Sequence, residues 1–318
     1  MNTTAKLSAY GAVLALIVTG AFTVGTAVGP LAGAAPEGVG HGDTHSGTVA
    51  EAQQTGNEQA GNGQQPGGLA STVGGYTLSP TDPTLITGPT TPFTFTITGP
   101  DGAPVTGFDV EHDKRMHLIV VRRDSSGFQH VHPEMAPDGT WSVPLTVPAA
   151  GSYRAFADFT PIGGAATTLG VDLAAAGSYE PVTHAPSRTA QVDGYTVELA
   201  GDLVAGQTSP ITLTVRRDGA EVTDLQPYLG AYGHLVALRE GDLAYLHVHP
   251  DGGPGVSAPG PQVEFAAEVP SAGTYRLFLD FRHGDVVRTA EFTVPTAGPG
   301  AVPAAPAAEP HGEPGHGH

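Results

Sequence analysis

Residues 148–159 read PAAGSYRAFADF, and residues 270–281 read PSAGTYRLFLDF. In both stretches a glycine-containing turn leads into a segment whose alternate residues are apolar. Alternation with a period of two is typical of a β-strand that buries one face. The two stretches therefore predict the same core strand in two copies of an all-β domain.

The duplication extends along most of the chain. Residues 93–108 correspond to 211–225, and residues 116–134 correspond to 233–251, in the same order. Each copy is built from short alternating segments separated by Gly, Pro and Asp turns, a pattern typical of a small antiparallel sandwich. The tyrosine that enters the strand, Tyr153 or Tyr275, stands where immunoglobulin-like domains have a tyrosine corner.

The predicted architecture is two tandem immunoglobulin-like antiparallel β-sandwiches after an N-terminal hydrophobic helix and a disordered tether. We predict repeat 1 at residues 73–180 and repeat 2 at residues 190–295. Residues 35–72 are predicted to be a disordered linker, because they contain almost no large apolar side chain, and residues 296–318 a disordered tail rich in Pro, Ala and Gly that contains histidines.

The amino-terminal region predicts export. Lys6 precedes an uncharged run at residues 7–28, and Ala32-Gly33-Ala34 resembles a signal-peptide cleavage site. Because the run is long enough to span a bilayer, residues 1–34 are predicted to be a signal peptide or, by preference, an uncleaved membrane anchor. Either prediction places the repeats outside the cytoplasm, secreted or membrane-anchored.

Composition excludes several functional classes. The 318 residues carry a net charge of −18, which disfavours binding to a nucleic-acid backbone and favours cations. The chain has no cysteine, so disulfides, thiolate ligands and a blue-copper site are excluded. The sequence contains no nucleophile elbow, phosphate loop or recognisable acid–base pair, and we therefore predict that the protein is not an enzyme.

Six histidines form two sets of three with the same spacing. In each repeat, twelve residues separate the first histidine from the second, and one residue separates the second from the third. They are His117, His130 and His132 in repeat 1, and His234, His247 and His249 in repeat 2. The runs that carry them flank a short polar turn, which predicts a β-hairpin with His117 opposite His132 and His234 opposite His249. Residues two apart share a face, so three imidazoles are predicted to converge in each repeat.

Converging imidazoles suit copper or zinc, and repeat 1 has two further soft donors. Met116 and Met135 are replaced by Gly233 and Gly252 in repeat 2. Thioether sulfur favours Cu(I), so the sequence predicts copper, with zinc as the alternative, and predicts it for repeat 1 first. The other interpretation of both methionines is simple packing.

The faces that carry the histidines also carry apolar residues such as Ile119, Val121 and Phe128. The histidines can therefore be packed core residues instead of ligands. On the neighbouring strand, Asp158 and Asp280 are expected to pair with Arg154 and Arg276, which share their face.

Two functional hypotheses follow. The first is an extracytoplasmic, membrane-proximal metal-binding protein, with copper preferred, that buffers or delivers the ion. The alternative is a pair of structural or interaction β-sandwich modules with packed histidines and no metal. The expected partners are a metal ion and, through an uncleaved N-terminal helix, the membrane; a protein partner is not identified by the sequence.

Residues 114–141, KRMHLIVVRRDSSGFQHVHPEMAPDGTW, and residues 151–161, GSYRAFADFTP, resemble a group of uncharacterised secreted or membrane-anchored bacterial proteins. These are similar to YtkA-like and copper-resistance immunoglobulin-like domains. The resemblance covers both repeats, about residues 74–294, and implies an extracytoplasmic β-sandwich with a link to copper or heavy-metal handling. Repeat 2 departs from the methionine-bearing pattern, so the implied copper site belongs to repeat 1.

Overall fold

The structure is a computed structural model that describes residues 66–246 and 248–298, without the side chain of residue 249. The predicted signal peptide or anchor, most of the predicted linker and nearly all of the predicted tail lie outside these residues. The described residues form strands, turns and loops. Among them there is no helix of the length and apolarity that crossing a bilayer requires.

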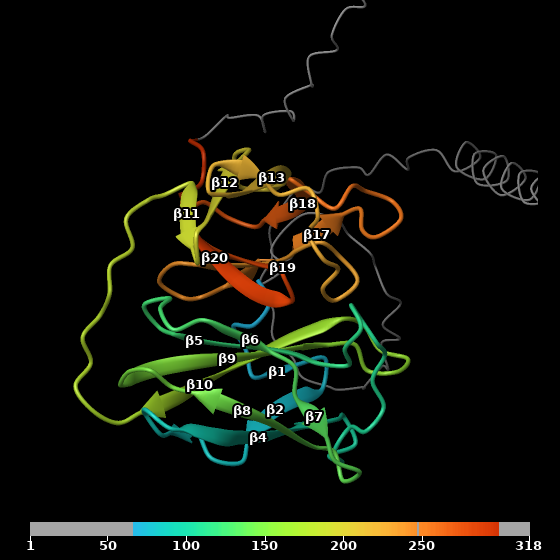
Figure 1. Ribbon diagram of the computed structural model, residues 1–318. Helices are drawn as coiled ribbons and strands as arrows, with labels where there is room; N and C mark the ends of the chain where they lie inside the picture. Colours follow the sequence, from blue (N-terminus) through green and yellow to red (C-terminus); the bar gives the residue numbers. More distant parts are fainter. Residues whose placement is uncertain (1–65, 247, 299–318) are drawn as a thin grey trace, which may run out of the picture. The chain divides into compact units, whose positions relative to one another are not determined.

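Repeat 1 is a sandwich of two sheets (Figure 1). Its strands are β1 (Thr72–Val73), β2 (Tyr76–Pro80), β3 (Thr84–Leu85), β4 (Thr90–Thr98), β5 (His117–Arg122), β6 (Gln129–Val131), β7 (Glu134–Met135), β8 (Thr140–Thr146), β9 (Gly151–Phe159) and β10 (Thr167–Ala175). One sheet has the order β1-β2-β4-β8-β7 and the other β3-β10-β9-β5-β6. Strand β3 pairs in parallel with β10, and the other pairs are antiparallel, as in immunoglobulin-like domains.

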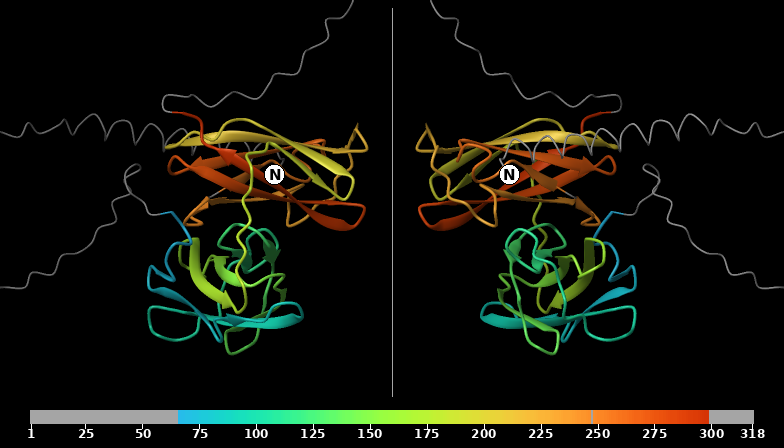
Figure 2. Two further views of the ribbon diagram at one scale, coloured as in Figure 1. Left: turned by 90° about the vertical axis from the view of Figure 1, so that its left-hand side faces the viewer. Right: turned by 90° about the vertical axis from the view of Figure 1, so that its right-hand side faces the viewer.

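Repeat 2 has the same plan. Its strands are β11 (Thr189–Val192), β12 (Tyr195–Ala200), β13 (Gln207–Arg217), β14 (Ala220–Glu221), β15 (His234–Arg239), β16 (Tyr245–Leu246), β17 (Val248–Asp251), β18 (Gln262–Val269), β19 (Thr274–His283) and β20 (Val286–Pro295). The sheets have the orders β11-β12-β13-β18-β17, with β14 on β13, and β16-β15-β19-β20. The layers of each sandwich can be followed in Figure 2. The predicted all-β fold of two tandem immunoglobulin-like sandwiches is confirmed.

Each sandwich has its own apolar core, and each contains the predicted tyrosine corner. Tyr153 is fully buried, and its hydroxyl donates to the carbonyl oxygen of Ala149 at 2.7 Å. In repeat 2 the Tyr275 hydroxyl donates to the carbonyl oxygen of Ser271 at 2.9 Å. Both corners lie at the start of a core strand, β9 in repeat 1 and β19 in repeat 2, so the predicted core strand forms in each copy.

A third buried cluster joins the two repeats. Its members come from repeat 1 and repeat 2 in nearly equal numbers: Ile119, Val121, Phe156, Val236, Leu238, Leu243 and Phe278, with Phe128 and Tyr245 packed against them. Phe128 stacks on Phe278 with ring centroids 3.9 Å apart and planes 3° from parallel. The face of the hairpin that carries the histidines therefore lies against the other repeat and not inside its own sandwich.

Successive side chains of a strand point to opposite faces, so one strand can contribute side chains to two cores. In β5, Leu118 and Val120 belong to the core of repeat 1, whereas Ile119 and Val121 belong to the cluster shared with repeat 2. All six residues of this strand are buried. A run that is apolar on both faces indicates a strand covered on both sides.

Residues 66–70 lie between the repeats. Gly68 donates its N–H to the carbonyl of Thr168 at 3.0 Å, and the carbonyl of Gly67 accepts the N–H of Tyr245 at 3.1 Å. Arg154, which is 6% exposed, donates through Nε and Nη2 to the carbonyl oxygen of Gly68 at 2.9 and 2.7 Å. This segment is therefore bonded to both sandwiches through its backbone.

Glycines make this contact possible. A Cβ on Gly170 would lie 1.9 Å from the carbonyl oxygen of Gly68, and Gly68 has a φ of 72°, which favours glycine. In repeat 2 the corresponding position on the last strand is Glu291, whose carboxylate accepts a bond from Arg276. Among the described residues, only repeat 1 therefore has the space at its last strand that admits residues 66–70.

Candidate metal centre

The register of the histidine hairpin in repeat 1 is the predicted one. Strand β5 pairs with β6 through Leu118↔Val131 and Ile119↔His130, and the next step places His117 opposite His132. In repeat 2, β15 pairs with β16 through Ala237↔Leu246 and Leu238↔Tyr245, but residues 248–251 form β17, which pairs with β18 of the other sheet and places His249 opposite Ala266. The predicted register is thus confirmed in repeat 1, whereas in repeat 2 the predicted pairing of His234 with His249 is wrong, because the chain crosses to the other sheet after β16.

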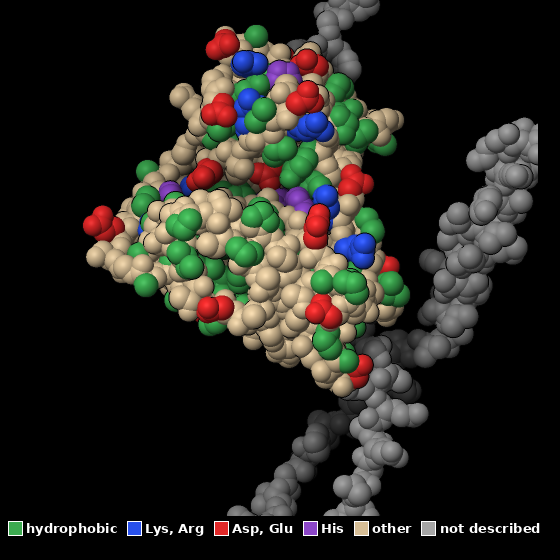
Figure 3. All heavy atoms as spheres, turned by 60° about the horizontal axis from the view of Figure 1, so that its bottom comes forward, with side chains coloured by type: hydrophobic (Ala, Val, Ile, Leu, Met, Phe, Trp, Pro, Cys, Tyr) green, Lys and Arg blue, Asp and Glu red, His purple; other side chains and the backbone are tan. Residues whose placement is uncertain are grey.

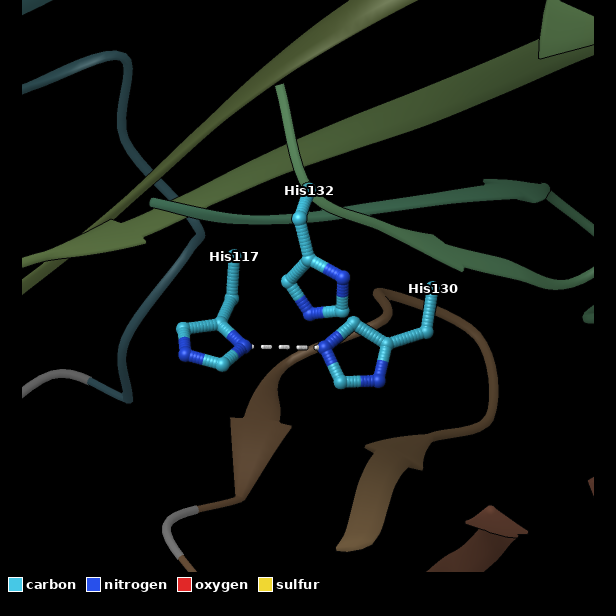
Figure 4. A group of neighbouring side chains, drawn as sticks. All are labelled: His117, His130 and His132. Atoms are coloured by element: carbon cyan, nitrogen blue, oxygen red, sulfur yellow. Dashed lines mark hydrogen bonds between the residues drawn. The ribbon is translucent and has the colours of Figure 1, made fainter. Parts of the chain in front are cut away.

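Three histidine rings of repeat 1 converge (Figure 4). The Nδ1 atom of His117 lies 3.1 Å from Nε2 of His130. One nitrogen of each of His117, His130 and His132 lies within 4.8 Å of the others. Two nitrogens that share a tetrahedral zinc or copper ion lie about 3.3 Å apart, so closing this group around an ion takes displacements of about 1.5 Å at most.

The outward-facing nitrogens of two of these rings are held by acceptors. The Nε2 atom of His117 donates to the carbonyl oxygen of Glu111 at 3.1 Å, which leaves the lone pair of the neutral ring on Nδ1. The Nδ1 atom of His130 lies 2.8 Å from a carboxylate oxygen of Asp280, and both side chains are almost fully buried. Such outer contacts fix the tautomer and orientation of metal-binding imidazoles.

His132 supplies the third nitrogen. Its Nε2 atom is buried and has no hydrogen-bond partner among the described residues. In Figure 4 this side of the ring faces the gap between His117 and His130. A buried polar atom without a partner costs free energy, which a bound cation would recover.

Burial keeps the rings of His117 and His132 uncharged. Burial, and then the neighbouring His130, lower the pKa of His117 to about 4. The same two causes lower the pKa of His132 to about 3. Neutral imidazole is the form that donates a lone pair to a metal ion, so both rings are ready ligands at neutral pH.

The second repeat places His234 beside this group of three. Its ring centroid lies 5.8 Å from that of His117 and 5.9 Å from that of His130, and its Nε2 lies 3.3 Å from the carbonyl oxygen of Leu229. Burial, followed by His130, lowers the pKa of His234 to about 3. Of the predicted ligands in repeat 2, His247 and the side chain of His249 lie outside the described residues.

One further histidine was missing from the predicted ligand set. The ring of His112 lies 4.8 Å from that of His234 and 6.2 Å from that of His117, measured between centroids. It precedes β5 in the stretch EHDKRMH. Its distance from the other histidines depends on a loop conformation, and the repeat pattern gives no signal for it because repeat 2 has Leu229 five residues before His234, not a histidine.

The structure places the two methionines away from the imidazoles. Met116 is 1% exposed and belongs to the core of repeat 1, and Met135 packs against the same core. Adjacent residues of a strand point to opposite faces, so Met116 turns inward when His117 turns toward the other repeat. Met135 lies on β7, in the other sheet.

The expected pairing of Asp280 with Arg276 does not occur. Arg276 bonds to Glu291 and to Thr293, whereas Asp280 accepts bonds from His130 and from the Thr289 hydroxyl at 2.6 Å. Four residues along a strand span about 13 Å, too far for a direct ion pair even on a shared face. Asp158 is bonded instead to Thr168, at 2.9 Å.

A cavity of about 220 Å³ lies beside the histidines. Its lining includes Glu111, His112, Lys114, Arg115, His117, His130, His234 and Tyr245. Figure 3 shows histidine side chains, in purple, at the surface next to basic and acidic side chains. The cavity gives small solutes a route to the rings from one side.

Two segments of the chain match the same family model. Residues 71–177 and residues 190–298 each match the family described as a domain of unknown function, DUF8832. The chain belongs to this family. Because the model matches twice, the duplication predicted from the sequence is confirmed. The description assigns no activity, and the predicted link to YtkA-like and copper-resistance domains is not shown by it.

No curated protein matches the chain. Among solved structures, the Escherichia coli adhesin FdeC is similar at 13% identity over 74% of this chain and 66% of that chain, with a TM-score of 0.22. Domains 5–6 of the S-layer protein SbsC are 14% identical over 70% and 96%, with a TM-score of 0.21. A membrane-anchored protein from Corynebacterium diphtheriae is 10% identical over 70% and 58%, also at 0.21. The chain thus spans less than two thirds of the adhesin, and similarity this low leaves function to be argued from the residues themselves.

Proposed function

We propose that the chain is a non-enzymatic, extracytoplasmic protein whose two β-sandwiches act together as one structural or interaction module. The location is supported by the uncharged run at residues 7–28 after Lys6, which is typical of an export signal or a membrane anchor. The joint action of the two domains is supported by the contact between them.

The buried cluster between the repeats carries this proposal. Phe156 of repeat 1 and Leu238 and Phe278 of repeat 2 are all 0% exposed in that cluster. Full burial of an apolar side chain of this size contributes about 1.5–3 kcal/mol, so separating the repeats would be costly. Packed histidines at the edge of this cluster support the modular hypothesis better than they support metal binding as the main role.

The test is the unfolding of the full chain by calorimetry. We expect one cooperative transition for the wild type and two separated transitions for Phe278→Ala, because this side chain lies in the shared cluster and not in the core of repeat 2. Val286→Ala, at a residue that is 46% exposed, is the control and keeps one transition. Two independent transitions in the wild type would contradict the proposal.

As a second candidate we propose metal buffering or delivery by the histidines of repeat 1. The observation that favours it is the convergence of three ring nitrogens within 4.8 Å, with Nε2 of His132 buried and without a partner among the described residues. His117, His130 and His132 would be the ligands, and the fourth position of a tetrahedral ion would remain open.

The choice of ion is less specific than the sequence predicts. Imidazole nitrogen suits both copper and zinc, whereas the thioethers of Met116 and Met135, which favour Cu(I), are packed in the core of repeat 1. We therefore propose a divalent transition-metal ion, zinc or copper, without a preference between them.

Metal analysis separates the two candidates. We expect the full chain to take up one Zn²⁺ or Cu²⁺ per site in competition with a weak chelator, and we expect His130→Ala/His132→Ala to lose that uptake while keeping its fold. Histidine-rich tracts as a class can take up metal ions, and the chain has histidines at residues 41, 45, 311, 316 and 318, so a chain in which these are changed to asparagine is the matched control. Absence of stoichiometric uptake by the full chain would reject the second candidate and leave the first.

A further inference from the structure

We propose that repeat 2 completes the metal site of repeat 1, with Asp280 as a positioning residue, so that docking of the two sandwiches sets the affinity for a divalent transition-metal ion. This inference rests on the second candidate function above. It concerns where the affinity comes from, because no side chain of repeat 2 belongs to the three-histidine group itself.

The carboxylate of Asp280 is held from both sides. One oxygen lies 2.8 Å from Nδ1 of His130, and the other accepts the hydroxyl of Thr289 at 2.6 Å. A carboxylate fixed in this way holds the His130 ring with its Nε2 atom toward His117, 3.1 Å away. This is the arrangement in which a carboxylate orients a metal-binding imidazole and raises its basicity.

The same strand carries the docking contact. Phe278 lies two residues before Asp280 on β19, and on the other repeat Phe128 lies two residues before His130. Phe128 and Phe278 stack at 3.9 Å. Residues two apart on a strand share a face, so the stack and the carboxylate contact form or break together. Separation of the sandwiches would withdraw Asp280 from His130.

Repeat 2 also covers one side of the site. His234 lies 5.8 Å from His117 and 5.9 Å from His130, measured between ring centroids. A ring at this place excludes water from one side of the site, and a dry site strengthens the contacts of the ion with its ligands. Undocking would expose His117 and His130 to solvent on the side that His234 covers.

The experiment measures Zn²⁺ affinity of the full chain by competition with a chromophoric chelator. We expect Asp280→Asn to lower the affinity about 10–100-fold, the usual effect of removing an outer carboxylate. We expect Phe278→Ala, which removes no ligand and no outer contact, to lower it to a similar extent. Asp285→Asn, a change at an exposed carboxylate of the same repeat, is the matched control and leaves the affinity unchanged.

A second readout separates positioning from general stability. With Co²⁺ in place of Zn²⁺, the visible absorption of the wild type reports the ligand geometry, and we expect Asp280→Asn to change this spectrum because His130 turns. Circular dichroism of the metal-free variants checks that they fold. If Phe278→Ala does not fold, Phe278→Leu replaces it, with a smaller loss of affinity expected.

The outcomes distinguish the two proposals. If the wild type takes up no Zn²⁺ stoichiometrically, the metal-binding candidate itself is rejected. If the wild type binds one ion, and both Asp280→Asn and the Phe278 variant retain wild-type affinity and the wild-type Co²⁺ spectrum, the metal site stands and the role of repeat 2 is overturned. Loss of affinity in both variants, together with an altered spectrum in Asp280→Asn, supports the inference.

Discussion

His130 of repeat 1 and Asp280 of repeat 2 lie 2.8 Å apart, measured from Nδ1 to Oδ2, although 150 residues separate them in the chain. Their side chains are only 3% and 5% exposed. The contact joins β6 of one sandwich to β19 of the other, next to the aromatic stack between Phe128 and Phe278. A buried contact of this kind makes each partner costly to remove.

Asp280→Asn is expected to destabilise the metal-free chain by about 1–3 kcal/mol, because the neutral amide has one accepting oxygen for the two groups, His130 and Thr289, that bond to the carboxylate. The measurement is urea unfolding of the full chain with a chelator present. Asp285→Asn, at a side chain that is 78% exposed, should change stability by no more than about 0.5 kcal/mol. Equal stability of the two variants would show that the contact contributes little.

The metal-free chain is expected to lose stability as the pH falls below about 6.5. The pKa values of His117, His132 and His234 are lowered in the folded chain to about 4, 3 and 3, mainly by burial. The unfolded chain therefore binds more protons between these values and 6.5, which favours unfolding throughout that window. Full stability is present above pH 6.5, and the loss is complete below about pH 3.

Urea unfolding in a chelator at pH 7.5, 6, 5 and 4 checks this pH dependence. His234→Gln should reduce the slope of stability against pH, because one of the three buried titrating groups is removed. A flat profile between pH 7 and pH 4, or a slope that His234→Gln leaves unchanged, would contradict the assignment of buried neutral imidazoles.

Gly170→Ala is expected to displace residues 66–70 from the slot between the repeats. The added Cβ would lie 1.9 Å from the carbonyl oxygen of Gly68, and Arg154 would lose the acceptor for two of its donors. A loss of about 1–3 kcal/mol follows from an unsatisfied buried guanidinium. Hydrogen exchange should accelerate at the amides of Gly68 and Tyr245, which bond across this segment.

Gly298→Ala is the matched control for this change, since a Cβ there meets no atom within 4 Å. It should leave both stability and exchange unaltered. Protection of the Gly68 amide that survives in Gly170→Ala would show that the segment is held by something other than this fit.

The two tyrosine corners are expected to contribute equally. Tyr153→Phe and Tyr275→Phe each remove a hydroxyl that donates to a carbonyl four residues earlier, at Ala149 and at Ser271. Each should cost about 0.5–1.5 kcal/mol in thermal or urea unfolding. The double variant should lose the sum, because the corners lie in separate cores and distant sites are additive. A double variant that loses much less than the sum would contradict this independence.

Much of the fold was predictable because its signals are local. Alternation identified the strands around Tyr153 and Tyr275, and the polar turn at residues 123–126 determined a hairpin register in which His117 stands opposite His132. Because the domain is duplicated, each of these sequence patterns occurs twice in the chain. The convergence of three imidazoles followed from that register, since paired and second-neighbour residues share a face.

The partners of that face were not predictable. Leu118 and Ile119 are equally apolar, and no local signal says which of them meets the core of its own sandwich and which meets a second domain. For the same reason the sequence did not show that Met116 points into the core of repeat 1 while His117 points toward repeat 2. Asp280 looked like a partner for Arg276 because only their shared strand was visible in the sequence.

By itself the sequence determined two immunoglobulin-like sandwiches and a cluster of three histidines on one hairpin face, because strand period, turn length and repetition are properties of neighbouring residues. Tertiary structure alone decided that this face is covered by the other repeat, that Asp280 holds His130, and that Gly170 admits the backbone of Gly68. These contacts depend on how two folded surfaces meet, and that complementarity arises only after each strand has taken its place.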